Sequence, residues 1–279
     1  MELGRIGIWA SALRMGGREH LPEAASVAEG LGYGTFWLGG SPPARALRPL
    51  LEATTTMVAA TGILNVWQEQ PADAAREHDA LAAAYPGRVL LGIGIGHPEA
   101  TSDYTRPLKT MRDFFDGLDA ADPPVPRDQR CAAALGPKML ALAAERSLGT
   151  HTYFTVSAHT RAAREAVGPG GLVAPEVACV VDPDPDSGRA KAREYAALYL
   201  GLRNYTSNLL RFGFTEDDLG DGGSDRLIDA VVPHGTAEHI AEHVQAHFAA
   251  GADHICLQVV GRTGVPRDDW DALARTLDA

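Results

Sequence analysis

A glycine-rich run followed by a histidine is the first place where this sequence could do chemistry. Residues 92–96 read Gly-Ile-Gly-Ile-Gly, but the dinucleotide fingerprint G-x-G-x-x-G fails because His97 or Glu99 stands where its last glycine belongs. The glycines instead predict a strand that a ligand or a neighbouring backbone approaches closely. His97 ends this strand, and its ordinary pKa near 6.5 makes it the candidate proton donor at neutral pH.

A second candidate site lies at residues 136–139, Gly-Pro-Lys-Met, between an expected strand and an expected helix. Free N–H groups at a helix start, together with the charge of Lys138, could hold a phosphate. An ordinary turn between a strand and a helix is the alternative. The sequence contains neither a GxxxxGK[ST] nor a G-x-S-x-G motif, so nothing supports P-loop chemistry or a serine nucleophile.

A third pattern, H-x-x-E-H, is formed by His239, Glu242 and His243, and His247 continues the same helical stripe. A zinc site would need a further carboxylate from another element and a dry cavity. Ile240, Val244 and Phe248 form the apolar stripe beside the histidines, so we expect no metal and largely solvated imidazoles.

Short apolar runs that alternate with amphipathic stretches must position these residues. The expected strands are Arg5–Trp9, Gly34–Leu38, Met57–Asn65, Arg88–Ile95, Arg130–Leu135, Thr150–Thr155, Glu176–Val181 and His254–Val260. The expected helices are Leu21–Leu31, Leu47–Thr54, Pro71–Tyr85, Pro107–Asp119, Lys138–Leu148, Thr160–Val167, Gly188–Leu200, Thr236–Ala250 and Trp270–Leu277.

Eight βα units within 279 residues predict an α/β fold, a TIM (β/α)8 barrel. Several strands are continuous apolar runs, as expected for parallel strands that are covered on both faces. A doubly wound open sheet is the competing fold. Residues 204–234 carry no strand signal and predict a helical insertion before the last strand, within a single domain that spans residues 1–279.

Composition narrows the function classes. Lys and Arg number 25 against 36 Asp and Glu, a formal charge of −11, so we expect neither nucleic-acid nor membrane-surface binding. Three scattered cysteines (Cys131, Cys179 and Cys256) lie in apolar runs, which fits a cytoplasmic protein. The sequence shows no signal peptide at its N-terminus and no apolar stretch of membrane-spanning length.

Four segments carry a resemblance to a known family. They are the run of residues 135–181, which includes G-P-K-M-L-A-L-A-A-E, H-T-R-A-A-R and A-P-E, and the segments FWLGG (36–40), TGILNVW (61–67) and AGADHICLQV (250–259). From about residue 5 to residue 277 the chain resembles the bacterial luciferase-like monooxygenase superfamily. Within it, the chain is most similar to probable coenzyme F420-dependent oxidoreductases.

The resemblance implies a barrel, usually a homodimer, that binds a deazaflavin or a flavin at the carboxyl ends of its strands. It implies a cis peptide bond between Gly62 and Ile63 behind the flavin ring, ring contacts from residues 94–97, and a phosphate loop at residues 134–139. The cofactor-binding residues it implies are Trp9, Gly39, Gly62, Ile63, Asn65, Gly96, Ala134, Leu135, Gly136, Pro137, Lys138, Met139 and Tyr153.

Two departures from the family pattern leave the substrate open. Some relatives carry an Asp-His pair after the second strand, where this chain has Gly39 and Gly40. Another relative has a glutamate in the place of His97. We expect the two glycines to leave room for a substrate, and three tryptophans near strand ends (Trp9, Trp37 and Trp67) to line an apolar pocket or to pack in the core.

The expected activity is therefore hydride transfer between coenzyme F420 and an unidentified small organic substrate. An FMN-dependent monooxygenase is one alternative, because it uses the same barrel. A catalytically inactive, flavin-free barrel that acts as a binding subunit is the other.

Overall fold

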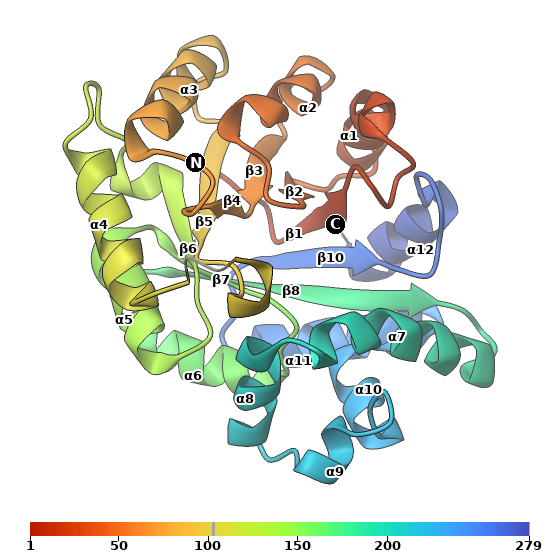
Figure 1. Cartoon of the computed structure of the whole chain (residues 1–279). Helices are drawn as coiled ribbons and strands as arrows, with labels where there is room; N and C mark the ends of the chain where they lie inside the picture. The colour runs from red at the N-terminus through yellow and green to blue at the C-terminus, as the bar shows by residue number, and fades with distance from the viewer. Residues whose placement is uncertain (102–103, 279) are drawn as a thin grey trace.

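Eight parallel strands close on themselves in the computed structural model, which describes residues 1–101 and 104–278 (Figure 1). The last of them pairs with both the first and the seventh, so the sheet forms a closed TIM-type barrel, as predicted. The barrel strands are β1 (Ile6–Ser11), β2 (Thr35–Gly39), β3 (Val58–Gly62), β5 (Val89–Gly94), β6 (Arg130–Ala133), β7 (Gly149–Thr152), β8 (Leu172–Val181) and β10 (Ile255–Val259).

Helices cover the outside of the barrel (Figure 1). They are α1 (Leu21–Gly30), α2 (Arg48–Glu52), α3 (Pro71–Ala84), α4 (Pro107–Asp119), α5 (Pro137–Arg146), α6 (Ser157–Val167), α7 (Pro185–Leu200), α11 (Ala237–Ala249) and α12 (Arg267–Leu277). The predicted insertion before the last strand consists of α8 (Arg203–Arg211), α9 (Glu216–Leu219) and α10 (Asp225–Val231). Two short strands, β4 (Leu64–Asn65) and β9 (His234–Gly235), pair with β5 and β8.

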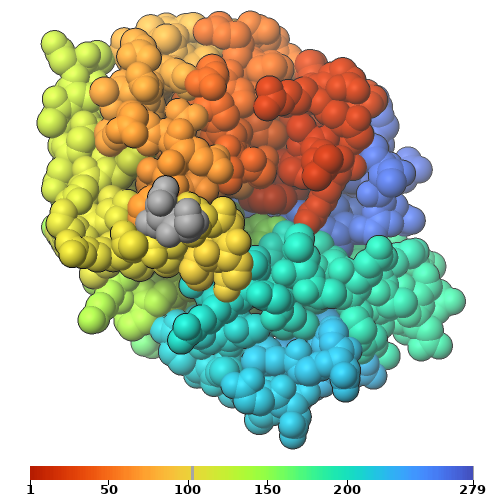
Figure 2. All heavy atoms as spheres, in the orientation of Figure 1, coloured from red at the N-terminus to blue at the C-terminus, as the bar shows by residue number. Residues whose placement is uncertain are grey.

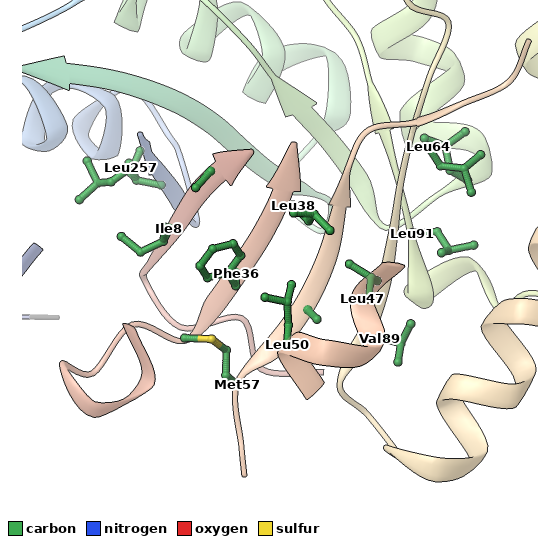
Figure 3. Close-up of a cluster of buried hydrophobic side chains, with 14 of the residues drawn as sticks. Ile8, Phe36, Leu38, Leu47, Leu50, Met57, Leu64, Val89, Leu91 and Leu257 are labelled. Atoms are coloured by element: carbon green, nitrogen blue, oxygen red, sulfur yellow. The ribbon is translucent and has the colours of Figure 1, made fainter. Parts of the chain in front are cut away.

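Successive residues of each strand point to opposite faces, and both faces are buried. On the outer face, Ile8 and Phe36 pack with side chains from the surrounding helices in the main core (Figure 3). On the inner face, Trp9 and Trp37 lie among small residues of the other strands. The apolar runs are continuous because neither face meets water.

The barrel interior contains a polar contact that links two strands. Trp37 is fully buried, its indole N–H donates to Nε2 of His254 at 3.1 Å, and its ring stacks on His151 with 4.6 Å between centroids. Nδ1 of His254 contacts the carbonyl of Gly4 at 2.8 Å. Trp37 is therefore a core residue and does not line an apolar pocket.

Several strand boundaries differ from the prediction, and two of the differences have clear local reasons. β8 begins at Leu172 and not at Glu176, and Pro175 lies inside it opposite Thr152. Proline has no N–H to donate and is rare in central strands, so the pattern predicted a later start. β7 ends at Thr152 and not at Thr155, because Phe154 adopts a left-handed φ of 53° that no strand continues through.

Candidate active site

The carboxyl ends of the barrel strands bring most of the predicted site residues to one end of the barrel. Gly39 ends β2, Gly62 ends β3, Gly96 and His97 follow β5, residues 134–139 join β6 to α5, and Tyr153 follows β7. The Gly62–Ile63 peptide bond is cis, as predicted. Active sites of this fold lie at this end of the barrel.

The indole of Trp9 covers two of the predicted glycines. A Cβ atom on Gly39 would lie 2.2 Å from the Trp9 ring, and one on Gly62 would lie 2.5 Å from its Nε1. Both positions must therefore be glycine while Trp9 keeps this rotamer. The expectation that Gly39 leaves room for a substrate is wrong, since the tryptophan fills that space.

Trp9 nevertheless offers a ligand one unsatisfied donor. Its side chain is 7% exposed, and its Nε1 has no hydrogen-bond partner in the described part of the chain. A buried N–H without an acceptor costs free energy, which an acceptor atom of a bound ring would recover. Beside it, Asn65 and Gly96 lie close together, because a Cβ on Gly96 would be 3.2 Å from Nδ2 of Asn65.

His97 lies at the rim, beneath the inserted helix α8. Its Nδ1 is 3.4 Å from Nδ2 of Asn204, and its ring is 4.9 Å from that of Tyr205. Burial lowers the pKa of His97 below its ordinary value, although the carboxylate of Glu99 acts in the opposite direction. The imidazole is therefore neutral at pH 7 and suited to accept a proton.

The start of α5 forms the other end of the predicted cofactor site. Gly136 is the residue before the helix, and its predicted neighbours Pro137 and Lys138 are exposed. Around the position of a Cβ on Gly136, the nearest atom is Nη2 of Arg211 at 3.9 Å. An open helix N-terminus with two nearby cations is an anion-binding arrangement. Arg211 comes from the inserted helix α8, and no sequence pattern indicates that it meets this loop.

The remaining residues of that loop hold the turn together. Ala134 is buried, and its N–H donates to the carbonyl of His151 at 3.2 Å. The carbonyl of Leu135 contacts Nε2 of His159 at 2.9 Å, and the N–H of Met139 donates to the carbonyl of Gly136 at 3.0 Å. These contacts fix the backbone that a phosphate would bind.

A cluster of tyrosines fills the space between Trp9 and α7, and sequence reasoning found only its first member, Tyr153. The Tyr153 hydroxyl lies 2.8 Å from the hydroxyls of both Tyr195 and Tyr199, and its ring is 5.2 Å from that of Trp9. The i, i+4 spacing of Tyr195 and Tyr199 on α7 is the only signal that could have revealed the cluster.

Among the described residues, Glu176 supplies the carboxyl group that bonds to this cluster. It is 1% exposed and accepts hydrogen bonds from Nε2 of Gln258 at 2.6 Å and from the N–H of Phe154 at 3.2 Å. Burial raises the pKa of Glu176 to about 7, although those two hydrogen bonds favour its charged form. Burial therefore moves the titration of this carboxyl group from the acidic range towards neutral pH.

The H-x-x-E-H stripe lies on helix α11. His239 is exposed and His243 half-buried, but His247 is 5% exposed and bonded to Oγ1 of Thr160 at 2.8 Å, so the expectation that it is solvated is wrong. Within residues 1–101 and 104–278, no group of three or more His, Cys, Asp or Glu side chains is placed to hold a metal ion.

Two hollows also lie outside the predicted cofactor site. One, of about 490 Å³, is lined by Arg127, Asp128, Ala144, Ser147, Leu148 and residues 167–171. The other, of about 730 Å³, is lined by residues of the insertion and of α7 and by His234, His239 and His243.

No helix in the described residues has the length and hydropathy of a membrane span.

Comparison with known proteins supports the predicted resemblance. The model of the luciferase-like monooxygenase family matches residues 5–121, whereas no curated protein sequence matches the chain. The fold is similar to that of an F420-dependent secondary alcohol dehydrogenase (18% identity, TM-score 0.74, 99% of each chain). It is also similar to the F420-dependent tetrahydromethanopterin reductase from Methanopyrus kandleri (14%, 0.76, 100% of this chain and 99% of that one).

An FMN complex has the same fold. The oxygenating constituent of 3,6-diketocamphane monooxygenase from Pseudomonas putida is 15% identical, with a TM-score of 0.70 over 99% of this chain and 98% of that one. At these identities the likeness establishes the fold. The barrel thus resembles both F420-dependent and FMN-dependent enzymes.

Proposed function

We propose that this protein is an oxidoreductase that binds the deazaflavin coenzyme F420 at the carboxyl ends of its strands. Its reaction is hydride transfer between that coenzyme and a small organic substrate. The observation that carries the proposal is the open start of α5, where Gly136 faces the guanidinium of Arg211 beside exposed Lys138. The homodimer implied by the resemblance is part of the proposal, and light scattering on the same sample measures it.

The chain supplies three functions around the cofactor. Gly136, Lys138 and Arg211 would hold its phosphate, and the unpaired N–H of Trp9 would meet an acceptor on its ring. When bound, the deazaflavin supplies or accepts the hydride. His97, neutral at pH 7, would accept or return the accompanying proton at its imidazole nitrogen.

The experiment is a parallel fluorescence titration of the purified protein with F420 and with FMN. Tight binding of F420 and weak binding of FMN is the expected result, and the reverse preference would support the monooxygenase alternative.

A flavin-free barrel is the second candidate function, because the Trp9 indole occupies the surface over Gly39 and Gly62. Binding of neither cofactor would establish that candidate.

Gly136→Val should weaken cofactor binding by at least about tenfold, because its side chain enters the space where the phosphate meets the N–H groups. The protein itself tolerates the change, since its nearest atom is 3.9 Å away at the end of a flexible arginine. Fluorescence titration measures the affinity. Gly30→Val, at an equally open position on α1, is the control and should bind as the parent does. Unchanged affinity of the Gly136 variant would place the phosphate elsewhere.

His97→Ala should leave cofactor affinity within a few-fold of the parent but lower turnover by about 100-fold, the effect typical of a lost acid–base group. Because the pKa of His97 is lowered, the parent should lose activity only below the ordinary histidine range near pH 6.5. Single-turnover rates against pH measure both effects. Normal turnover of the variant would make His97 a packing residue for Tyr205.

A further inference from the structure

Arg14 lies in the loop after β1 and contacts the tyrosine cluster. Its Nη1 donates to Oε1 of Gln258 on β10, and its Nη2 donates to the hydroxyl of Tyr199 at 3.1 Å. Its guanidinium carbon is 4.8 Å from the centre of the Tyr195 ring. Contacts with two elements, α7 and β10, thus hold this half-buried cation at the strand ends. Figure 2 shows a red segment from the N-terminal part of the chain touching the teal region of the surface.

The guanidinium of Arg14 has no carboxylate partner of its own. None of the ion pairs of the described residues, taken to 4.0 Å, includes it, whereas Arg130, Arg164 and Arg262 each contact a carboxylate. Glu176 lies on the far side of Gln258, which donates to that carboxyl through Nε2 and accepts from Arg14 through Oε1. An amide therefore separates the cation from this carboxyl group.

A half-buried guanidinium that is held by phenol and amide oxygens retains donors and a positive charge for a ligand. Carboxylates match the planar donor array of arginine, and the surrounding tyrosine and tryptophan rings suit an apolar body. We propose that Arg14 recognises a carboxylate group of the substrate, so that the substrates of this protein are small organic acids. The reaction they undergo rests on the proposed function, but their binding does not.

The charge of Glu176 should tune this site. Other titratable groups face Arg14 and Glu176. Burial raises the pKa values of three of them, Tyr153, Tyr195 and Tyr205, well above the ordinary tyrosine value, so these hydroxyls stay neutral. His151 lies near Tyr153, and burial lowers its pKa to about 4. His97 touches Tyr205 and is neutral above pH 6.5. Deprotonation of Glu176 near pH 7 is thus the change that weakens the attraction for an anion as the pH rises.

The test is a titration of the cofactor-free protein with benzoate and with benzamide, its neutral counterpart, at constant ionic strength and followed by tryptophan fluorescence. At pH 6 the parent should bind benzoate at least tenfold more tightly than benzamide. Arg14→Gln should remove that preference and leave benzamide binding unchanged. Arg18→Gln, which alters an exposed arginine in the same loop, is the matched control and should keep the preference. Equal affinities of the parent for the two compounds, or binding of neither, would overturn the proposal.

Two further measurements test whether Glu176 controls the binding of the carboxylate and whether Arg14 binds the substrate or the cofactor. The benzoate affinity of the parent should fall about tenfold between pH 6 and pH 8, and Glu176→Gln should abolish that fall. The Arg14→Gln variant should bind F420 as the parent does. If it loses cofactor affinity instead, Arg14 recognises an acidic group of the cofactor and the substrate proposal is wrong. Failure of the parent to bind F420 would contradict the proposed function alone.

Discussion

Acidification from pH 6.5 to pH 4 should unfold this protein, because three buried histidines are neutral in the native state and charged in the unfolded chain. His151, His247 and His254 are each at most 5% exposed, and burial lowers the pKa of each to about 4. A group whose pKa is depressed by folding contributes stability above its unfolded pKa, and that stability is lost as the pH falls.

The expected loss is large compared with the stability of a typical protein. Lowering the pKa of a histidine from 6.5 to about 4 corresponds to about 3 kcal/mol of stability, or about 10 kcal/mol for the three histidines. Glu176 acts in the opposite direction with about 3 kcal/mol, because its raised pKa makes the fold gain stability as the pH falls from 7 to 4.5. For these four groups together the loss is about 7 kcal/mol, which is comparable with the usual total stability of about 5–15 kcal/mol.

Hydrogen-bond geometry explains why His254 in particular resists protonation. Its Nε2 accepts the indole N–H of Trp37, so its proton lies on Nδ1 and points to the carbonyl of Gly4. A second proton on Nε2 would face the Trp37 N–H and break that bond. Protonation and opening of the barrel interior are therefore coupled.

Urea denaturation between pH 7.5 and pH 5 measures this effect. His247→Gln should reduce the pH dependence of the free energy of unfolding by the equivalent of about one proton. His20→Gln, at a half-exposed histidine, should leave that dependence unchanged and serves as the control. A His247→Gln curve that parallels the parent would show that His247 is not buried as a neutral group.

The fold was predictable because its signals are local. Several barrel strands are short apolar runs, and most strand candidates are followed by a helical pattern, so the eightfold repeat is visible without knowledge of any contact. The boundaries that failed, at Pro175 and Phe154, depend on backbone conformations that residue type does not specify. Hydrophobic periodicity also does not reveal whether the sheet closes into a barrel or stays open.

The candidate site was predictable only where it follows the strands. Gly62, His97 and Gly136 each end a strand or open a helix, and their positions in the sequence give their positions in the barrel. Arg14 and Gln258 are 244 residues apart and meet because β10 closes the barrel against β1. A contact created by that closure has no counterpart in local sequence.

The same distinction applies to the glycines of β5, which the sequence predicted to be approached by a ligand or by a neighbouring backbone. A Cβ on Gly92 would lie 2.0 Å from the carbonyl oxygen of Thr61 on β3 and 3.1 Å from the Trp37 ring. The neighbour is therefore backbone, which cannot rotate away. Gly94 differs, because the nearest atom to its Cβ would be the side-chain end of Ile63, at 2.2 Å.

Gly92→Ala should therefore lower the free energy of unfolding by about 3 kcal/mol or more, since one methyl group must push β5 away from β3 in a closed barrel. The shift would also strain the hydrogen bond from Oγ1 of Thr61 to the carbonyl of Gly92, which is 2.8 Å long and fully buried. Urea denaturation at pH 7.5 gives the difference, and soluble yield records a complete failure to fold.

Gly170→Ala is the matched control for this prediction. Gly170 is exposed, no atom lies within 4 Å of its Cβ position, and its φ is not left-handed. Alanine there should change the stability by less than about 0.5 kcal/mol. If Gly92→Ala were as stable as this control, a methyl group would fit between β3 and β5, and the two strands could not lie as close together as the 2.0 Å distance implies. The positions of these strands, and with them that of the Gly62–Ile63 bond at the end of β3, would then have to be revised.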